Sequence, residues 1–302
     1  MSHDPGYHFT DEEAQIYSGE EARRRLQEVD EARFLSADGG IVQVSQERWQ
    51  AAQRFERKGW MEKWRGAADD RNYDHMAGFD GYRVLRGRTF AGAVELGCGP
   101  FTNTRLIGGR CRIREISLLD PLIESYLTLE TASYDRTSLK AANRLAQWGA
   151  PGGSVARRAV RKTCRIFPAL GRTTIPVKEI FPTAIENMPA RPQAYDLVIL
   201  INVIEHCFDL PKIFEKILEM SRPGACFVFH DHLYEHKVVA EMVQGRHYEA
   251  GHPLMADYRV VERFCRENFE PLFERRATAP IGDHPILKEH RTYYFIGRRR
   301  DS

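Results

Sequence analysis

Short apolar runs alternate with amphipathic stretches from residue 91 onward, and this alternation restricts the possible fold more than any other feature of the chain. The runs AGAVELG, REISLLD, AYDLVILIN, ACFVFHD and RTYYFIG predict strands at 91–97, 114–120, 194–202, 225–231 and 291–297, and LFERRATA predicts another at 272–279. The stretches 210–221 and 255–269 predict helices. Near-continuous apolar strands separated by helices indicate a doubly wound, mostly parallel α/β sheet that is covered on both faces. Because ligands bind beyond the carboxyl ends of such strands, site residues are expected just after each run.

The first 90 residues have a different pattern. Residues 11–35 and 45–64 are predicted to be amphipathic helices, and the apolar face of the second is formed by Trp49, Ala52, Phe55, Trp60 and Trp64. This face is expected to pack on the domain behind it, which is compatible with covering a ligand. We therefore predict an N-terminal helical cap or lid at 1–90 and a ligand-binding core at 91–302. The core has an insertion around 128–175, whose basic run at 157–165 is expected to be solvated.

Composition narrows the class of protein. The 302 residues are 28% charged and 42% hydrophobic, with a net charge of +2, so nothing in the overall charge favours nucleic acid or an anionic membrane as a partner. The six cysteines contain no C-x-x-C pair and are expected to be reduced, mostly buried thiols. The first residues are polar and acidic, unlike a signal peptide, and no apolar run reaches the roughly 20 residues that span a bilayer. We expect a soluble cytoplasmic protein, and the oligomeric state is left open.

The turn after the first strand, VELGCGPFTNT, bears directly on the ligand. Gly97 and Gly99 allow a sharp turn and bring bare backbone close to a ligand. A dinucleotide-binding loop has a third glycine where Thr102 stands, and its helix N-terminus receives a pyrophosphate. Glu95, at the end of the strand, repels phosphate and suits a cationic ligand. The loop therefore argues against a Rossmann oxidoreductase.

The second strand ends in Asp120, an acid that can accept hydrogen bonds from both ribose hydroxyls. Together with the glycine turn, it indicates a ligand with a ribose and an ammonium group but no phosphate. S-adenosylmethionine fits this description, whereas NAD does not. A purely structural role for the turn is disfavoured, because Glu95 and Asp120 each fall at a strand end.

VELGCGPFTNT, LLDP and AYDLVILINVIEH together resemble the class I S-adenosylmethionine-dependent methyltransferases, in particular their small-molecule branch. The resemblance covers about residues 90–300 and implies a Rossmann-like, seven-stranded, mostly parallel sheet whose last strand is antiparallel. It implies that Glu95, Gly97 and Gly99 line the methionine end of the cofactor and that Asp120 binds the ribose. By the same resemblance, Pro121 lies beside the adenine and Asn202 near the sulfonium. An aspartate often found in the family is replaced by Ala184, so Ile185 or Glu186 is expected to contact the adenine.

Methyl transfer needs a nucleophile held close to the methyl group and, in many cases, a base that takes its proton. His206, in NVIEHC, and Asp231 and His232, in HDHLYEH, follow strand ends and are the catalytic candidates. A neutral histidine or a carboxylate there could deprotonate an alcohol or orient an amine. His230 and His236 lie in the same HDHLYEH stretch, whereas His75 lies before the core and His284 and His290 lie late in the chain.

Two alternatives stay open. The stretch NVIEH resembles an E-x-x-E-H pattern with which related O-methyltransferases hold a divalent cation. Here Asn202 stands in place of the first glutamate of that pattern. Glu205, His206, His230 and His232 could together form a metal site in a metal-assisted enzyme acting on phenols or RNA ends, although no metal ligand is assigned. A non-catalytic adenosyl-binding protein could carry the same loop.

The preferred function is transfer of a methyl group from S-adenosylmethionine to nitrogen or oxygen of a small polar metabolite, leaving S-adenosylhomocysteine. The chain has a faint resemblance to bacterial natural-product methyltransferases that modify amino sugars, which favours an amino sugar or aminoglycoside, as in antibiotic biosynthesis. No nucleic-acid or membrane partner is expected.

Overall fold

The computed structural model describes residues 35–36, 40–63, 81–140, 174–235, 251–278 and 291–301. The predicted helix 11–35, Trp64, the basic run 157–165 and the histidines at 75, 236, 284 and 290 lie outside these residues, apart from residue 35 itself.

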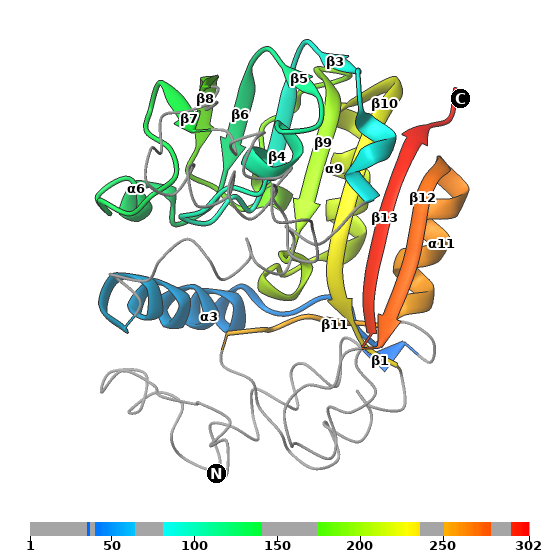
Figure 1. Cartoon of the computed structure of the whole chain (residues 1–302). Coiled ribbons are helices and arrows are strands. Elements are labelled where there is room, and N and C mark those ends of the chain that lie inside the picture. The colour runs from blue at the N-terminus through cyan, green and yellow to red at the C-terminus, as the bar shows by residue number, and fades with distance from the viewer. Residues whose placement is uncertain are drawn as a thin grey trace, which may run out of the picture.

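One eight-stranded sheet forms the centre of the fold (Figure 1), with strand order β12-β13-β10-β9-β4-β6-β8-β7. The neighbours from β10 to β8 pair in parallel, whereas β13 is antiparallel to both β10 and β12 and β7 is antiparallel to β8. The strands are β4 (Ala93–Leu96), β6 (Ile116–Leu119), β7 (Ser138–Lys140), β8 (Thr174–Phe181), β9 (Tyr195–Ile201), β10 (Ser221–Leu233), β12 (Phe269–Thr278) and β13 (Arg291–Arg299).

The predicted doubly wound, mostly parallel sheet is confirmed, including its antiparallel last strand β13. All six strands predicted from apolar runs are present. The seventh, β8, has no continuous apolar run because its residues alternate between exposed and buried. The short β7 adds an eighth strand at the edge. There are two smaller sheets. One joins β1 (Leu35–Ser36), β2 (Gly40–Ile41) and β11 (Met255–Ala256), and the other joins β3 (Thr89–Phe90) and β5 (Arg112–Ile113).

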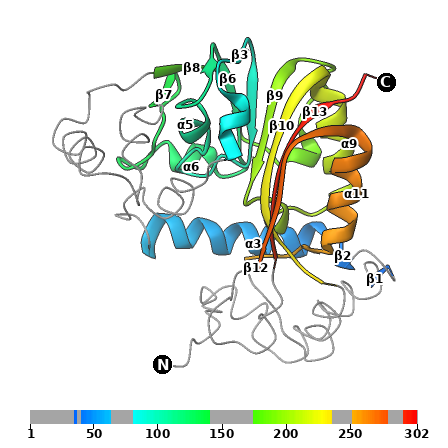
Figure 2. The ribbon, with the colours of Figure 1, turned by 45° about the vertical axis from the view of Figure 1, so that its right-hand side comes forward.

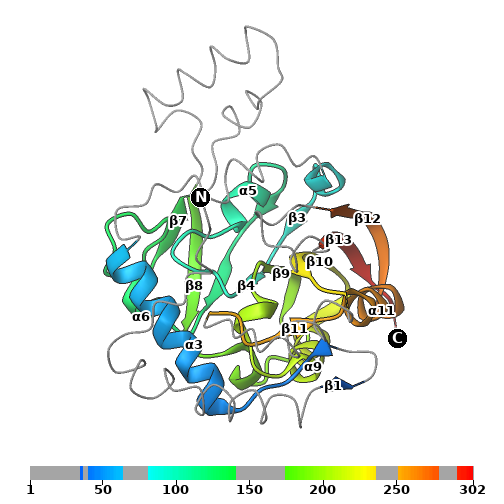
Figure 3. The same cartoon turned by 90° about the horizontal axis from the view of Figure 1, so that it is seen from below.

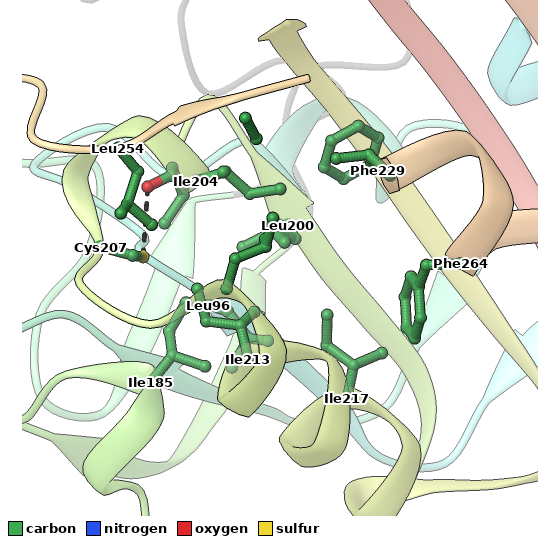
Figure 4. Close-up of a cluster of buried hydrophobic side chains, with 14 of the residues drawn as sticks. Leu96, Ile185, Leu200, Ile204, Cys207, Ile213, Ile217, Phe229, Leu254 and Phe264 are labelled. Carbon is green, nitrogen blue, oxygen red and sulfur yellow. Dashed lines mark hydrogen bonds between the residues drawn. The ribbon is translucent and has the colours of Figure 1, made fainter. Parts of the chain in front are cut away.

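Helices cover both faces of the central sheet (Figure 2). One face packs against α9 (Leu210–Met220) and α11 (Tyr258–Asn268) through a buried cluster that includes Leu200, Ile213 and Phe264 (Figure 4). Each of these helices begins at an aspartate whose side chain accepts a backbone N–H of the first turn, Asp209 for α9 and Asp257 for α11.

The opposite face packs against α5 (Thr104–Ile107) and a 3₁₀ helix at Gly81–Leu85, and α6 (Ile123–Tyr126) contributes Ile123 to the same cluster. Side chains alternate between the two clusters along each strand, so that Leu197 and Ile199 belong to this face and Val198 and Leu200 to the other.

The helix α3 (Gln46–Lys58) lies along the edge at which the parallel strands end (Figures 1 and 3). It begins at Ser45, whose side chain accepts the Arg48 N–H, and continues into a π-helical turn at Gly59–Lys63. The predicted helix at 45–64 is therefore present through Lys63. Among the described helices, none has the length and apolar character needed to cross a membrane.

Candidate functional site

A cavity of about 580 Å³ opens at the carboxyl ends of the parallel strands, within the range of about 300–1,000 Å³ typical of small-molecule sites. The loops after five consecutive strands of the sheet, β8, β6, β4, β9 and β10, contribute to its lining, and α3 covers it. The chain runs from β4 outward to β8 and then returns to β9 on the other side of β4. The cavity therefore lies at the topological switch point, where doubly wound sheets bind their ligands.

The glycine turn after β4 lines the cavity with Gly97 and Gly99. Gly97 has a φ of 70°, and a Cβ there would lie 2.4 Å from the Val203 side chain, so only glycine fits. The Gly97 and Cys98 N–H groups donate to the Leu119 carbonyl at 2.7 and 3.0 Å. The turn is thereby tied to the end of β6, next to Asp120.

Asp120 lines the cavity and is 8% exposed. One carboxylate oxygen accepts the Gly99 N–H at 3.0 Å and the other accepts the Leu122 N–H at 2.8 Å. Burial raises its pKa to about 6, against these two hydrogen bonds, which lower it. The carboxylate is thus fixed in direction, with one partner on each oxygen, and each oxygen keeps acceptor capacity for a ligand.

Glu95 differs from the expectation that it touches the ligand, because it does not line the cavity. Its carboxylate accepts the Asn103 N–H at 2.7 Å, the Thr104 N–H at 3.2 Å and the Thr104 hydroxyl at 2.5 Å. Burial raises its pKa to about 7 despite these bonds. Its position at the strand end has a structural reason: it holds the start of α5 and, through it, the shape of the glycine turn.

The segment after β8 places Ile185 and Glu186 in the cavity lining, and Pro121 lies in it as well. One Glu186 oxygen accepts the N–H groups of Phe208 and Asp209 at 2.7 and 3.0 Å. The other oxygen is buried and has no hydrogen-bond partner among the described residues. Asn103 also lines the cavity, and its side-chain oxygen is likewise buried without a hydrogen-bond partner among the described residues. Both residues line the cavity, so a small shift of either side chain would present a buried acceptor to a ligand that brings N–H donors.

Asn202 follows β9 and lines the cavity. Its backbone adopts the left-handed conformation, with a φ of 57°. Asparagine is one of the few residues that tolerate this conformation, which costs roughly 1–3 kcal/mol and persists where surrounding structure enforces it. The Asn202 N–H donates to the His230 carbonyl at 2.7 Å. This turn directs the following residues, Glu205 and His206, into the cavity lining.

Asp231 also differs from its predicted catalytic place. It is fully buried and does not line the cavity. Its carboxylate accepts the N–H groups of Val203, Ile204 and His232 at 2.9, 2.8 and 2.7 Å. These contacts fix the loop after β9.

His206 and His232 both line the cavity. The Nδ1 of His206 lies 3.1 Å from the Gly251 carbonyl oxygen, and burial lowers the pKa of this imidazole. The ring is therefore neutral near pH 7. The Nδ1 of His232 lies 3.2 Å from the Thr292 hydroxyl. His230 is buried outside the lining, and its ring stacks on Tyr294 at 4.2 Å, so Glu205, His206, His230 and His232 do not form one site.

Several residues of the lining are not predicted by the sequence. They come from α3, from the loops near the glycine turn and from the segment before β11: Gln53, Glu56, Phe101, Tyr126 and His252. Helical spacing places Gln53 and Glu56 on the face of α3 that carries Trp49. This face continues to Trp60 in the π-helical turn, so the spacing could have revealed Gln53 and Glu56. No sequence pattern marks His252, which reaches the cavity only through the tertiary fold.

The helix α3 is fastened to both ends of the cavity. Trp49 Nε1 and Gln53 Nε2 each donate to the His206 carbonyl at 3.1 Å. At its other end, the Trp60 ring meets Phe101 and Tyr126 edge-on, with ring centroids 5.7 and 6.4 Å apart. The helix thus closes the cavity over the strand ends and carries the carboxylate of Glu56 into it.

The charge of the lining is one-sided. Among the described residues that line the cavity there are four carboxylates, Glu56, Asp120, Glu186 and Glu205, and no lysine or arginine. Such a site attracts cations and disfavours phosphate.

The chain matches one family model and is similar to solved structures. Residues 73–276 match a family model described as a methyltransferase domain. No curated protein matches the chain.

Among solved structures, the chain is similar to the N-methyltransferase NodS of Bradyrhizobium japonicum WM9 bound to S-adenosylhomocysteine (11% identity, 84% of this chain and 99% of that one, TM-score 0.45). It is similar to the 1,6-didemethyltoxoflavin-N1-methyltransferase of Burkholderia thailandensis (12% identity, 89% and 99%, TM-score 0.45). It is also similar to geranyl diphosphate methyltransferase (10% identity, 75% and 85%, TM-score 0.43).

Proposed function

We infer the function from one premise: this chain belongs to the methyltransferase family whose domain model spans residues 73–276, and it is an S-adenosylmethionine-dependent enzyme. We propose that it methylates nitrogen or oxygen of a small polar metabolite, with an amino sugar or aminoglycoside as the preferred acceptor. The observation that carries this proposal is the composition of the cavity, which combines carboxylates and imidazoles with no lysine or arginine among its described lining residues.

The cofactor is proposed to lie across the ends of β8, β6 and β4. Asp120 accepts hydrogen bonds from the ribose, with Pro121 and Ile185 beside the adenine. Gly97, Gly99 and Asn202 contact the methionine part. The negative lining suits the sulfonium and ammonium charges of S-adenosylmethionine. Glu95 supports this arrangement indirectly, by fixing the glycine turn.

The unpartnered oxygen of Glu186 is proposed to accept the adenine amino group, a hydrogen bond that the Ala184 side chain is unable to make. The inosine analogue S-inosylhomocysteine has a carbonyl there and cannot donate. We expect the wild-type protein to bind S-adenosylhomocysteine at least about tenfold more tightly than the inosine analogue, since a hydrogen bond to a charged group contributes about 1.5–3 kcal/mol. In Glu186→Ala this preference should vanish. An unchanged ratio of the two calorimetric affinities in the variant would contradict the assignment.

The raised pKa of Asp120 predicts a pH dependence of cofactor binding. Because the carboxylate form accepts the ribose hydroxyls, we expect affinity for S-adenosylhomocysteine to fall below pH 6, reaching about a tenfold loss at pH 5 relative to pH 7. The pKa of Asp120 in the folded protein is raised from its ordinary value of 3.8, so protonation of this group stabilises the folded state as pH falls from about 6 to 3.8. The expected loss of affinity is therefore not caused by unfolding linked to Asp120. Calorimetry from pH 5 to pH 8 measures the effect, and Asp120→Asn should flatten it.

The acceptor is proposed to bind on the β9 and β10 side of the cavity, where His206 and His232 lie in the lining. A neutral imidazole there takes the proton of an attacking hydroxyl or amine. Carboxylates such as Glu205 hold hydroxyl and ammonium groups of the acceptor. The cover formed by α3 excludes water from the sulfonium.

A panel of aminoglycosides, neutral sugars and phenols, assayed with isotopically labelled donor, tests the acceptor class. We expect transfer to amino sugars or sugars. Turnover confined to phenols would reject this class, and binding of the cofactor without transfer to any acceptor would favour a non-catalytic adenosyl-binding protein.

A further inference from the structure

We propose that Glu56, His206 and His252 bind one divalent first-row transition-metal ion at the acceptor end of the cavity. This inference rests on the proposed function and deepens it, because the ion would hold the acceptor oxygen for methylation. The three residues come from α3, from the 3₁₀ helix Ile204–His206 and from the segment before β11. They are far apart in sequence, and the fold alone brings them together.

The geometry of these donors suits one ion. One ligand atom from each of the three side chains can be chosen so that all lie within 4.8 Å of one another. Two ligands on opposite sides of an ion lie about 4.2 Å apart at metal–ligand distances near 2.1 Å, so modest side-chain movement completes the site. Glu56 Oε1 lies 3.9 Å from His206 Nδ1, and the rings of His206 and His252 are 4.6 Å apart. The Gly251 carbonyl oxygen, 3.1 Å from the same Nδ1, is a further oxygen donor at this place.

A second carboxylate, Glu205, lies next to the two imidazoles without being one of the three donors. Glu205 Oε1 lies 3.8 Å from His206 Nε2 and 3.6 Å from His252 Nε2. These separations exceed the usual range of about 2.7–3.2 Å for a hydrogen bond. Glu56, His206 and His252 alone form the group whose ligand atoms lie within 4.8 Å of one another, and Glu205 adds a negative charge beside it. Their side chains are only 7–28% exposed, which limits competition from bulk water.

The donor set decides the class of ion. Imidazole nitrogen together with carboxylate oxygen favours zinc, cobalt, manganese or iron over magnesium and calcium, which prefer oxygen ligands alone. When bound, the ion would polarise a coordinated acceptor hydroxyl, and a histidine of the lining outside the donor set, His232, would take its proton. The resulting alkoxide forms a bond to the methyl carbon, the carbon–sulfur bond breaks, and its electron pair returns to sulfur. The ion changes neither charge nor oxidation state.

Calorimetric titration of the chelator-treated full chain with Co²⁺ and with Zn²⁺ tests the site, and Co²⁺ adds a visible absorption change as a second readout. We expect one equivalent to bind. His252→Ala and Glu56→Gln should each weaken metal binding more than about tenfold. Mutation of a residue that only hydrogen-bonds to a metal ligand already lowers metal affinity about 10–100-fold. Glu47→Gln, an exposed substitution on the same helix, is the matched control and should bind like the wild type.

Titration of the same samples with S-adenosylhomocysteine separates the two proposals. Intact cofactor binding also shows that the variants are folded. If the wild type binds neither Co²⁺ nor Zn²⁺, or if both variants bind them unchanged, the metal site is rejected. Retained affinity for S-adenosylhomocysteine in that case leaves the proposed methyltransferase function standing.

Discussion

Asp120→Ala is expected to weaken binding of S-adenosylhomocysteine by about 100-fold, because two ribose hydrogen bonds to a buried carboxylate together contribute about 3 kcal/mol. The carboxylate is aligned in advance by the N–H groups of Gly99 and Leu122, so little ordering is needed when the ligand binds. Calorimetry with the wild type and the variant measures the change.

The same substitution also leaves two backbone N–H groups without their acceptor, so a control for structural damage is required. Asp196 provides it. Its carboxylate likewise accepts two backbone N–H groups, those of Ala91 and Gly92 at 2.8 and 3.0 Å, but it does not line the cavity. Asp196→Ala should lower the free energy of unfolding by a similar amount and leave cofactor affinity unchanged. Equal affinity losses in both variants would refute a ribose-binding role for Asp120.

His206→Ala is expected to lower kcat by about 10²–10⁴, the usual contribution of a positioned proton-transfer group. In the metal-free enzyme the ring beside the Gly251 carbonyl, whose pKa is lowered by burial, can accept the proton. With the ion bound it is a ligand and His232 accepts the proton, so its loss lowers kcat in either case. Affinity for S-adenosylhomocysteine should change less than about threefold, since no cofactor contact is assigned to this side chain. Single-turnover kinetics with labelled donor separates the two quantities.

Lys212→Ala, in the first turn of α9 and outside the cavity lining, is a suitable control for the effect of a substitution near this loop. It should leave both kcat and cofactor affinity unchanged. Wild-type kcat in His206→Ala would place the acceptor chemistry elsewhere in the cavity.

Much of the fold could be predicted because parallel strands buried on both faces consist of continuous apolar residues. Val198, Ile199 and Leu200 pack in turn on opposite layers, and this leaves an unmistakable pattern in the sequence. The strand β8 could not be predicted in the same way because Thr174, Pro176 and Lys178 are exposed while Ile175 and Val177 are buried. Its pattern is that of a partly exposed strand near the edge of the sheet.

The site was only partly predictable, because position at a strand end does not reveal where a side chain points. Asp120 faces the cavity, whereas Glu95 and Asp231 point into the protein and hold loops through backbone N–H groups. All three are acids at or near strand ends. What distinguishes them is the path of the loop that follows, and that path depends on contacts between distant segments.

The contribution of α3 illustrates the same limit. Its apolar face predicted packing on the core, and Trp49 and Trp60 do pack there. The polar residues of that face are Gln53 and Glu56. Their place in the cavity depends on His206 and His252, which the sequence does not show to be nearby.

A crystal structure of the full chain with S-adenosylhomocysteine tests the proposed cofactor site most directly. We predict both ribose hydroxyls within hydrogen-bonding distance of Asp120, the adenine amino group at Glu186, and the sulfur on the Asn202 side, open toward His206. A nucleoside bound elsewhere, or a ribose turned away from Asp120, would contradict this assignment.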